Sequence, residues 1–209
     1  WVHDDRRETT DKAKALITYP RVRLGNDNLG LCKLPWVDVF NPESQNMKDT
    51  DIYINPASQE IYADFYNAML GTDMTWQQIF AQTDRDINLQ RVMNAMVYGF
   101  ETGSHDWIPD RAIGPTDDEL YEAEKPYNDL DLSKILGKTV EEVHAMDTTV
   151  KRETLMKHRK EQLRKLVNEY YRERGWTAAG IPTLDTLKGL GLWQYLSEDA
   201  KSRMAEITA

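Results

Sequence analysis

The chain has 209 residues, of which 29% are charged, and a formal net charge of -9 at pH 7. This length can bury a sizeable core, whereas the acidic balance argues against nucleic-acid binding, which needs a basic face. No apolar run approaches the ~20 residues of a membrane span, and no signal-peptide pattern is visible. The single cysteine, Cys32, excludes internal disulfides and fits a reducing compartment, so we expect a cytoplasmic protein.

The first 25 residues are polar and predict one short helix. It would begin at Asp11, continue to Ile17 and end at Pro20, because proline cannot continue the helical hydrogen-bond ladder. The opening Trp1-Val2-His3 looks like the middle of a polypeptide. We therefore expect the C-terminal part of a longer protein.

The stretch 26–35 predicts a loop or strand-like turn that carries binding groups. Asp27 can accept hydrogen bonds from an amine or amide edge, and Asn28 is a turn former that leaves backbone N–H groups free. Gly30 lets a bulky group approach the backbone closely, and Cys32 supplies a thiolate of the kind that binds iron in a cluster. A buried cysteine beside an ordinary turn explains the same residues without any ligand.

Two helices are predicted between residues 51 and 100. The first begins at Pro56 after an asparagine N-cap, and its apolar residues recur at a spacing of four. They are Ile61, Phe65 and Met69. Thr75 and Gln78 form a capping box that opens a second helix of about 23 residues, which ends at Gly99.

The second half of the chain predicts a long loop followed by helices. Residues 101–137 carry glycines, prolines and acidic residues without a clear pattern, which favours a functional or wrapping loop. Thr139 and Glu142 form another capping box, and a long helix that reaches Arg174 follows. Its basic residues are interleaved with glutamates, as on a solvated helix face. No alternation of period two persists, so the predicted fold class is all-α.

Three stretches of the chain resemble one known family, in the same order. Asp-x-x-Gly-Leu-Cys at 27–32 resembles the second pterin- and cluster-binding motif of the aldehyde:ferredoxin oxidoreductase family, the tungsten enzymes. Asn-Leu-x-Arg at 88–91, followed by Asn94 and a Gly-Phe helix end, resembles a helix of that family. The block 170–192, with Tyr-Tyr, Arg-Gly-Trp, Gly-Ile-Pro-Thr and Leu-Gly-Leu, is similar to the family's C-terminal end.

The resemblance implies the helical C-terminal domain of a larger multidomain oxidoreductase. Members of the family hold tungsten between two pterins beside a [4Fe–4S] cluster, and convert an aldehyde and water to a carboxylic acid. The cofactor-binding residues carried over are Asp27, Asn28, Gly30, Leu31, Cys32 and Lys33. Asp27 would hydrogen-bond a pterin ring, and Cys32 would be the metal ligand, the last thiolate of the cluster. The other three thiolates are expected elsewhere, and no catalytic residue is assigned.

On this basis, residues 1–209 are expected to form one mostly helical domain. Its parts are a cofactor-contacting loop region with Cys32 (1–50), a helical pair (51–100), a long loop (101–137) and C-terminal helices (138–209).

The implied partners are the N-terminal domains of the same enzyme, a small-molecule aldehyde, and ferredoxin or an electron-transfer subunit. No nucleic acid and no membrane span are expected, and an oligomer is left open. Two alternatives remain. One is a tungsten-dependent aromatic acyl-CoA reductase, of the benzoyl-CoA type, from the same superfamily. The other, from a different class, is a non-catalytic helical interaction domain in which Cys32 binds nothing.

Overall fold

The computed structural model describes residues 13–31, 56–99 and 106–208. Within these ranges the regular structure is helical, apart from an isolated bridge between Trp176 and Pro182. The predicted all-α fold is therefore confirmed. None of the helices in this part of the chain combines the length and apolar character that a membrane crossing requires.

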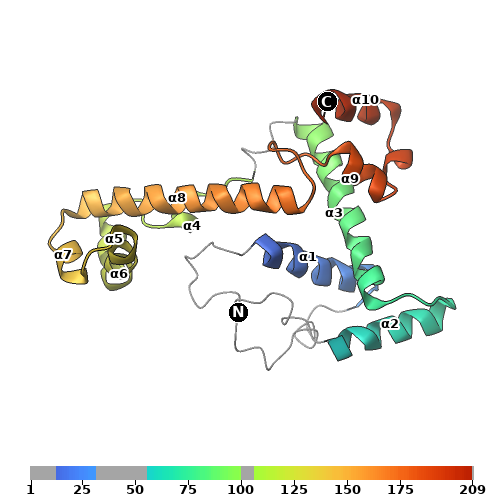
Figure 1. The fold of residues 1–209 in the computed structure, drawn as a ribbon, viewed down its shortest axis with the longest axis horizontal. Helices are drawn as coiled ribbons and strands as arrows, with labels where there is room; N and C mark the ends of the chain where they lie inside the picture. Colours follow the sequence, from blue (N-terminus) through green and yellow to red (C-terminus); the bar gives the residue numbers. More distant parts are fainter. Residues whose placement is uncertain (1–12, 32–55, 100–105, 209) are drawn as a thin grey trace.

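Helix α8 is the longest of the described elements, and most of the other helices lie towards its two ends, whereas α4 lies beside its middle (Figure 1). The bounds are α1 Ala13–Asn28, α2 Pro56–Leu70, α3 Trp76–Tyr98, α4 Asp110–Ile113, α5 Asp118–Ala123, α6 Lys125–Leu136, α7 Val140–His144, α8 Thr148–Glu173, α9 Leu184–Gly189 and α10 Glu198–Thr208. Helices α5, α6 and α7 lie at one end of α8, whereas α3, α9 and α10 lie at the other. Helix α1 packs against both α3 and α8.

Helix α3 begins and ends where the sequence predicts. The Thr75 hydroxyl accepts a hydrogen bond from the Gln78 N–H at 3.3 Å, and the Gln78 side chain accepts one from the Thr75 N–H at 2.8 Å. Gly99 ends the helix by donating its N–H to the Ala95 carbonyl. The predicted capping box at Thr139 is confirmed in the same way, at the start of α7.

Helix α1 differs from the prediction, because it contains Pro20 in its interior and continues to Asn28. The predicted end at Pro20 is therefore wrong. The loop predicted for 26–35 starts inside this helix, and the loop region predicted for 1–50 includes it. An interior proline removes one backbone hydrogen bond, but the packing of α1 on α3 and α8 outweighs that loss.

The long loop predicted for 101–137 is also wrong over most of its length, because α4, α5 and α6 lie there. Asp117 caps α5 by accepting a hydrogen bond from the Leu120 N–H at 2.8 Å. Pro126 lies in the first turn of α6, where proline is favoured because its missing N–H would be unpaired anyway. In the sequence alone, a proline among glycines and acidic residues is typical of a loop, and for this reason the helix was not predicted.

Two hydrophobic cores lie at the two ends of α8. The one near α3 contains Val92, Ala95, Ile181, Leu187, Leu192, Leu196, Ala200 and Met204. The one near α6 contains Tyr121, Leu132, Val143 and Leu155. The expectation of a single domain for the whole chain stays a prediction.

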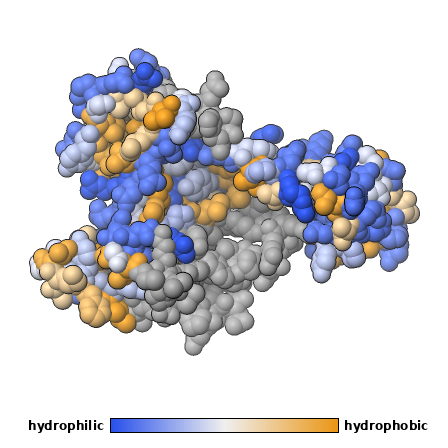
Figure 2. Space-filling view, turned by 180° about the vertical axis from the view of Figure 1, so that it is seen from behind, coloured by the Kyte–Doolittle hydropathy of each residue, from blue (hydrophilic) through white to orange (hydrophobic). Residues whose placement is uncertain are grey.

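The apolar face predicted for α2 is correct as a pattern, but it faces outward. Ile61, Phe65 and Met69 are each more than half exposed. Figure 2 shows the corresponding hydrophobic surface at the lower left of the molecule, where α2 lies.

Candidate cofactor-binding site

Helix α3 is the element on which the three stretches singled out in the sequence meet. The end of α1, with the first stretch, packs on one part of α3. The second stretch belongs to α3 itself, and the third stretch follows α8 and contacts α3 through Trp176 and Gly180.

Two polar contacts fix α1 on α3. The Arg21 Nε donates to both oxygens of the Asp84 carboxylate at 3.1 Å, and its Nη2 donates to one of them at 2.6 Å. At the last residue of α1, the Asn28 side-chain amide donates to Asp86 at 2.6 Å. Paired bonds from a guanidinium to a carboxylate fix geometry as well as adding energy, so α1 is held at a defined position.

Gly25 adds a close packing contact between the same two helices. A Cβ atom built on Gly25 would lie 2.1 Å from the ring of Phe80, which is itself buried. Helix α1 can therefore lie this close to α3 only because residue 25 has no side chain.

Replacing Gly25 with alanine should lower the free energy of unfolding by about 1–3 kcal/mol, because the added methyl group overpacks against Phe80. Chemical denaturation of the full-length protein measures the effect. Gly189→Ala is the matched control, since Gly189 is also helical and no described residue lies within 4 Å of an added Cβ. That control should leave stability unchanged or raise it; equal losses from both changes would contradict the contact.

Helix α1 ends in an exposed turn that carries four of the predicted cofactor-binding residues. They are Asp27, Asn28, Gly30 and Leu31. The turn is closed by a hydrogen bond of 2.8 Å from the Leu31 N–H to the Asn26 carbonyl. Gly30 has a φ of 70°, a conformation that favours glycine. No atom of the described residues lies within 4 Å of a Cβ built on Gly30, so this part of the chain leaves room for a bulky group at its backbone.

Asn26 provides a second observation that fits a cofactor at this turn. Its side chain is buried, yet no described residue donates a hydrogen bond to its Oδ1. A buried acceptor of this kind normally has a partner, and a donor from outside the described residues would complete it. The turn therefore fits the polar edge of a bound group.

The metal ligand predicted from the sequence cannot be placed in the same way. Cys32 and Lys33 lie outside the described residues, and their roles stay predictions. Among the residues that the structure does describe, no three His, Cys, Asp or Glu side chains form a group that could hold a metal ion.

Arg91 in α3 joins the second and third stretches. Its Nε donates to the Gly180 carbonyl at 2.7 Å, and its Nη1 donates to Asp106 at 2.9 Å. The hydroxyl of Tyr171 also donates to Asp106. Burial, together with this hydrogen bond, raises the pKa of the Tyr171 phenol above its ordinary value, so the phenol stays protonated as a donor. The Arg91 guanidinium lies 4.8 Å from the ring centre of Trp176.

The turn after α8 completes this arrangement. The Trp176 Nε1 donates to the Asn88 side chain at 2.8 Å. The Gly175 carbonyl accepts hydrogen bonds from the hydroxyls of Thr183 and Thr186, at 2.9 and 2.7 Å. Because these polar groups bond to one another, we interpret the block 170–192 as a structural element that packs beside α3.

Asp84 is the residue that the sequence analysis missed. It accepts a hydrogen bond of 2.7 Å from the Arg174 Nη1, in addition to those from Arg21. A signal for it exists in the sequence, since Asp84 lies four residues after Phe80 and four before Asn88. Residues at that spacing share one helix face, and both neighbours are buried.

A cavity of about 250 Å³ lies beside Asp84, between α1, α3, α8 and α9. Its charged lining residues are Arg21, Asp84, Glu173, Arg174 and Asp185. Both signs of charge are present, and the two arginines already bind Asp84. Neither arginine is therefore left over to attract an anionic ligand into this cavity.

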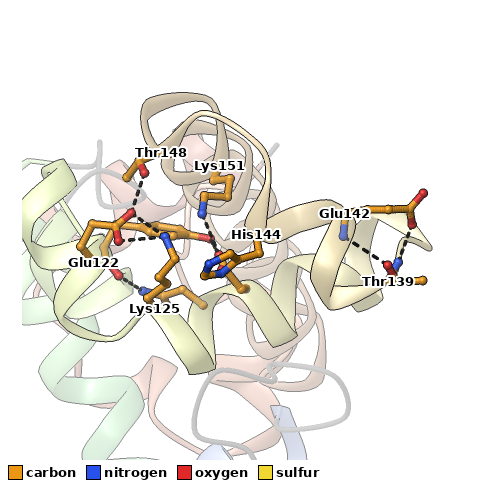
Figure 3. Close-up of polar contacts among 10 residues, drawn as sticks. Glu122, Lys125, Thr139, Glu142, His144, Thr148 and Lys151 are labelled. Carbon is orange, nitrogen blue, oxygen red and sulfur yellow. Dashed lines mark hydrogen bonds and ion pairs between the residues drawn. The ribbon is translucent and has the colours of Figure 1, made fainter.

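A separate polar cluster lies at the far end of α8 (Figure 3). Asp129 accepts hydrogen bonds from the Tyr121 hydroxyl at 2.8 Å and the Lys151 amine at 3.1 Å, and it lies 3.2 Å from His144 Nδ1. Figure 3 shows Lys151 from α8 and His144 from α7 converging there. The Lys151 side chain is 0% exposed and that of Asp129 is 2% exposed, so a ligand cannot reach the pair and its role is structural.

The pKa of Asp129 reflects this environment. Burial disfavours the charged carboxylate, but the hydrogen bonds from Tyr121 and Lys151 outweigh burial and hold the pKa of Asp129 below its ordinary value. Burial and the bond to Asp129 raise the pKa of the Tyr121 phenol. The cluster is thus a carboxylate held ionised by its donors.

Comparison with protein-family models gives a match over most of the chain. The model described as aldehyde ferredoxin oxidoreductase, domains 2 & 3, matches residues 2–192. No curated protein and no solved structure matches the chain. The matched range includes all three stretches that meet on α3.

Proposed function

The chain belongs to the aldehyde ferredoxin oxidoreductase family, and from that premise we propose that it is part of a tungsten–pterin, iron–sulfur enzyme. The enzyme oxidises an aldehyde to a carboxylic acid and passes the electrons to ferredoxin or another acceptor. The observation that carries the proposal is the turn at the end of α1. Four cofactor-motif residues are exposed there on a helix fixed to α3, and the third stretch also contacts α3, through Arg174 and Trp176.

In this proposal, the turn binds and orients the cofactors. The Asp27 carboxylate accepts hydrogen bonds from the pterin edge, as carboxylates do from amine and amide donors. Asn28, Gly30 and Leu31 lie along the same group, and the open space beside Gly30 admits it. Cys32 provides one cluster thiolate, and Lys33 follows it. The pterin-bound metal and the cluster supply the redox chemistry; we assign no proton-transfer role to this chain.

The family match to domains 2 and 3 implies other domains of the same enzyme. Such a domain needs an apolar surface to pack against, and α2 exposes one through Ile61, Phe65 and Met69. Exposed apolar patches on a folded domain commonly mark such interfaces. We propose that the remaining cluster thiolates come from those domains, because a [4Fe–4S] cluster takes four and this chain has one cysteine.

Metal analysis and substrate assays of the anaerobically purified full-length protein test the proposal. We expect tungsten, about four iron atoms per chain, and reduction of an artificial acceptor with aldehydes. If the protein acts on aromatic acyl-CoA esters and not on aldehydes, its function is reduction of an aromatic ring and the proposal of aldehyde oxidation is wrong. A protein that contains neither tungsten nor iron would contradict both enzymatic functions and favour a helical interaction domain.

A further inference from the structure

Asp84 connects α1, the helix that carries the cofactor-binding turn, to the block 170–192. Arg21 reaches it from α1 through three hydrogen bonds, and Arg174 reaches it from the end of α8 through one of 2.7 Å. The carboxylate side chain is 14% exposed and that of Arg174 is 3% exposed. The pair of Asp84 with Arg174 is therefore less weakened by salt than a surface pair. Arg21, whose side chain is 42% exposed, holds α1 through paired hydrogen bonds to the same carboxylate.

The position of Arg21 along α1, where it binds Asp84 of α3, matters for the turn. Arg21 precedes Asp27 by six residues, which is about 9 Å along a helix. Between them, Gly25 packs directly on Phe80, and beyond them Asn28 binds Asp86. A helix held at these points cannot slide or rotate without moving the turn that follows it.

We propose that Asp84 is a positioning residue, which holds α1 against α3 and the end of α8 and thereby sets where the turn at 27–31 meets the cofactors. The proposal rests on the function proposed above. Asp84 itself touches no cofactor in this account. It acts through Arg21 and the rigid helix α1, as residues that orient metal ligands do in other metal sites.

A purely structural role for Asp84 is the competing explanation, and a matched ion pair separates the two. Asp131 in α6 accepts a hydrogen bond of 2.7 Å from Arg159 in α8, with side chains that are 17% and 7% exposed. This pair has nearly the same length and burial as the pair of Asp84 with Arg174. It lies at the other end of α8, away from α1 (Figure 1).

The experiment compares Asp84→Asn with Asp131→Asn in the full-length holoenzyme. Both variants should lose stability, because each leaves a buried guanidinium without its partner. Only Asp84→Asn should alter the electron paramagnetic resonance spectrum of the reduced cluster and release iron to a chelator about tenfold faster. Arg21→Gln is the second variant: it removes the contact between α1 and Asp84, keeps the pair of Asp84 with Arg174, and should change the spectrum in the same direction even if Asp84→Asn does not fold.

The positioning role would be overturned if Arg21→Gln had the same spectrum and the same rate of iron release as the wild type. The same result in Asp84→Asn, where that variant folds, would also overturn it. An equal change in Asp131→Asn would also overturn it, because general destabilisation would then explain the effect. A wild-type enzyme without iron would instead contradict the proposed function. The two failures are therefore distinguishable.

Discussion

Full-length enzyme with Cys32→Ala is expected to lose its iron–sulfur cluster and, with it, aldehyde oxidation. The chain has no other cysteine, so this part of the enzyme offers no second thiol to take its place. Iron should fall from about four atoms per chain towards zero, and turnover should fall by about a hundredfold or more. Iron analysis, resonance spectra of the reduced enzyme and an aldehyde assay measure these losses.

Gly189→Ala is a suitable control for Cys32→Ala, because an added Cβ there meets nothing and the residue belongs to no predicted site. It should retain both iron and activity. The circular dichroism of Cys32→Ala should keep its helical signal, which would exclude unfolding as the cause. Retention of the cluster spectrum without Cys32 would show that this thiol does not bind iron.

Asp129→Asn should cause the largest loss of stability in the part of the chain around α6 and α8. It leaves the ammonium of Lys151, which is 0% exposed, without its carboxylate. Breaking a buried charge pair by removing one partner costs about 3–5 kcal/mol, a large share of the 5–15 kcal/mol that typically stabilises a domain. Thermal and chemical unfolding measure the loss.

Replacing both partners, as Asp129→Asn with Lys151→Met, is the matched test. The double variant should recover part of the lost stability, because no unpaired buried charge remains. If the loss of stability in the double variant equals the sum of the losses in Asp129→Asn and Lys151→Met, the two side chains are not coupled.

The same pair predicts a dependence on pH. Because the pKa of Asp129 is lowered in the folded state, its ionised form contributes stability above the unfolded pKa of about 4. That contribution is lost as the pH falls through the lower pKa of the folded state. Wild type should therefore lose more stability than Asp129→Asn when the pH is lowered below about 4.

Local signals in the sequence predict the helix boundaries well, because a cap is made within four residues. The capping boxes at Thr75 and Thr139 and the glycine end at residue 99 are examples. The continuation of α1 past Pro20 has no local signal, since it depends on packing against α3 and α8. In the same way, Pro126 starts a helix that its neighbours in sequence did not reveal.

The contacts of the candidate site are much less predictable than its residues. The resemblance identified the turn at 27–32 and the residues Asn88, Arg91 and Trp176, but not that the last three contact one another. Arg21 and Asp84 are 63 positions apart, and Arg174 and Asp84 are 90 apart. No local pattern encodes such pairs, because they form only when the fold brings distant helices together.

Asp106 has a consequence for how the protein can be altered. It binds Arg91 in α3 and Tyr171 near the end of α8. The start and the end of the segment between Asp106 and Tyr171 are therefore both held beside α3. The segment between these anchors projects away from α3 as an arm, and the exposed turn between α6 and α7 lies near its tip (Figure 1). Exposed turns of this kind tolerate inserted sequence. An affinity tag or a fluorescent reporter belongs there, where it would leave the anchors and the end of α1 untouched.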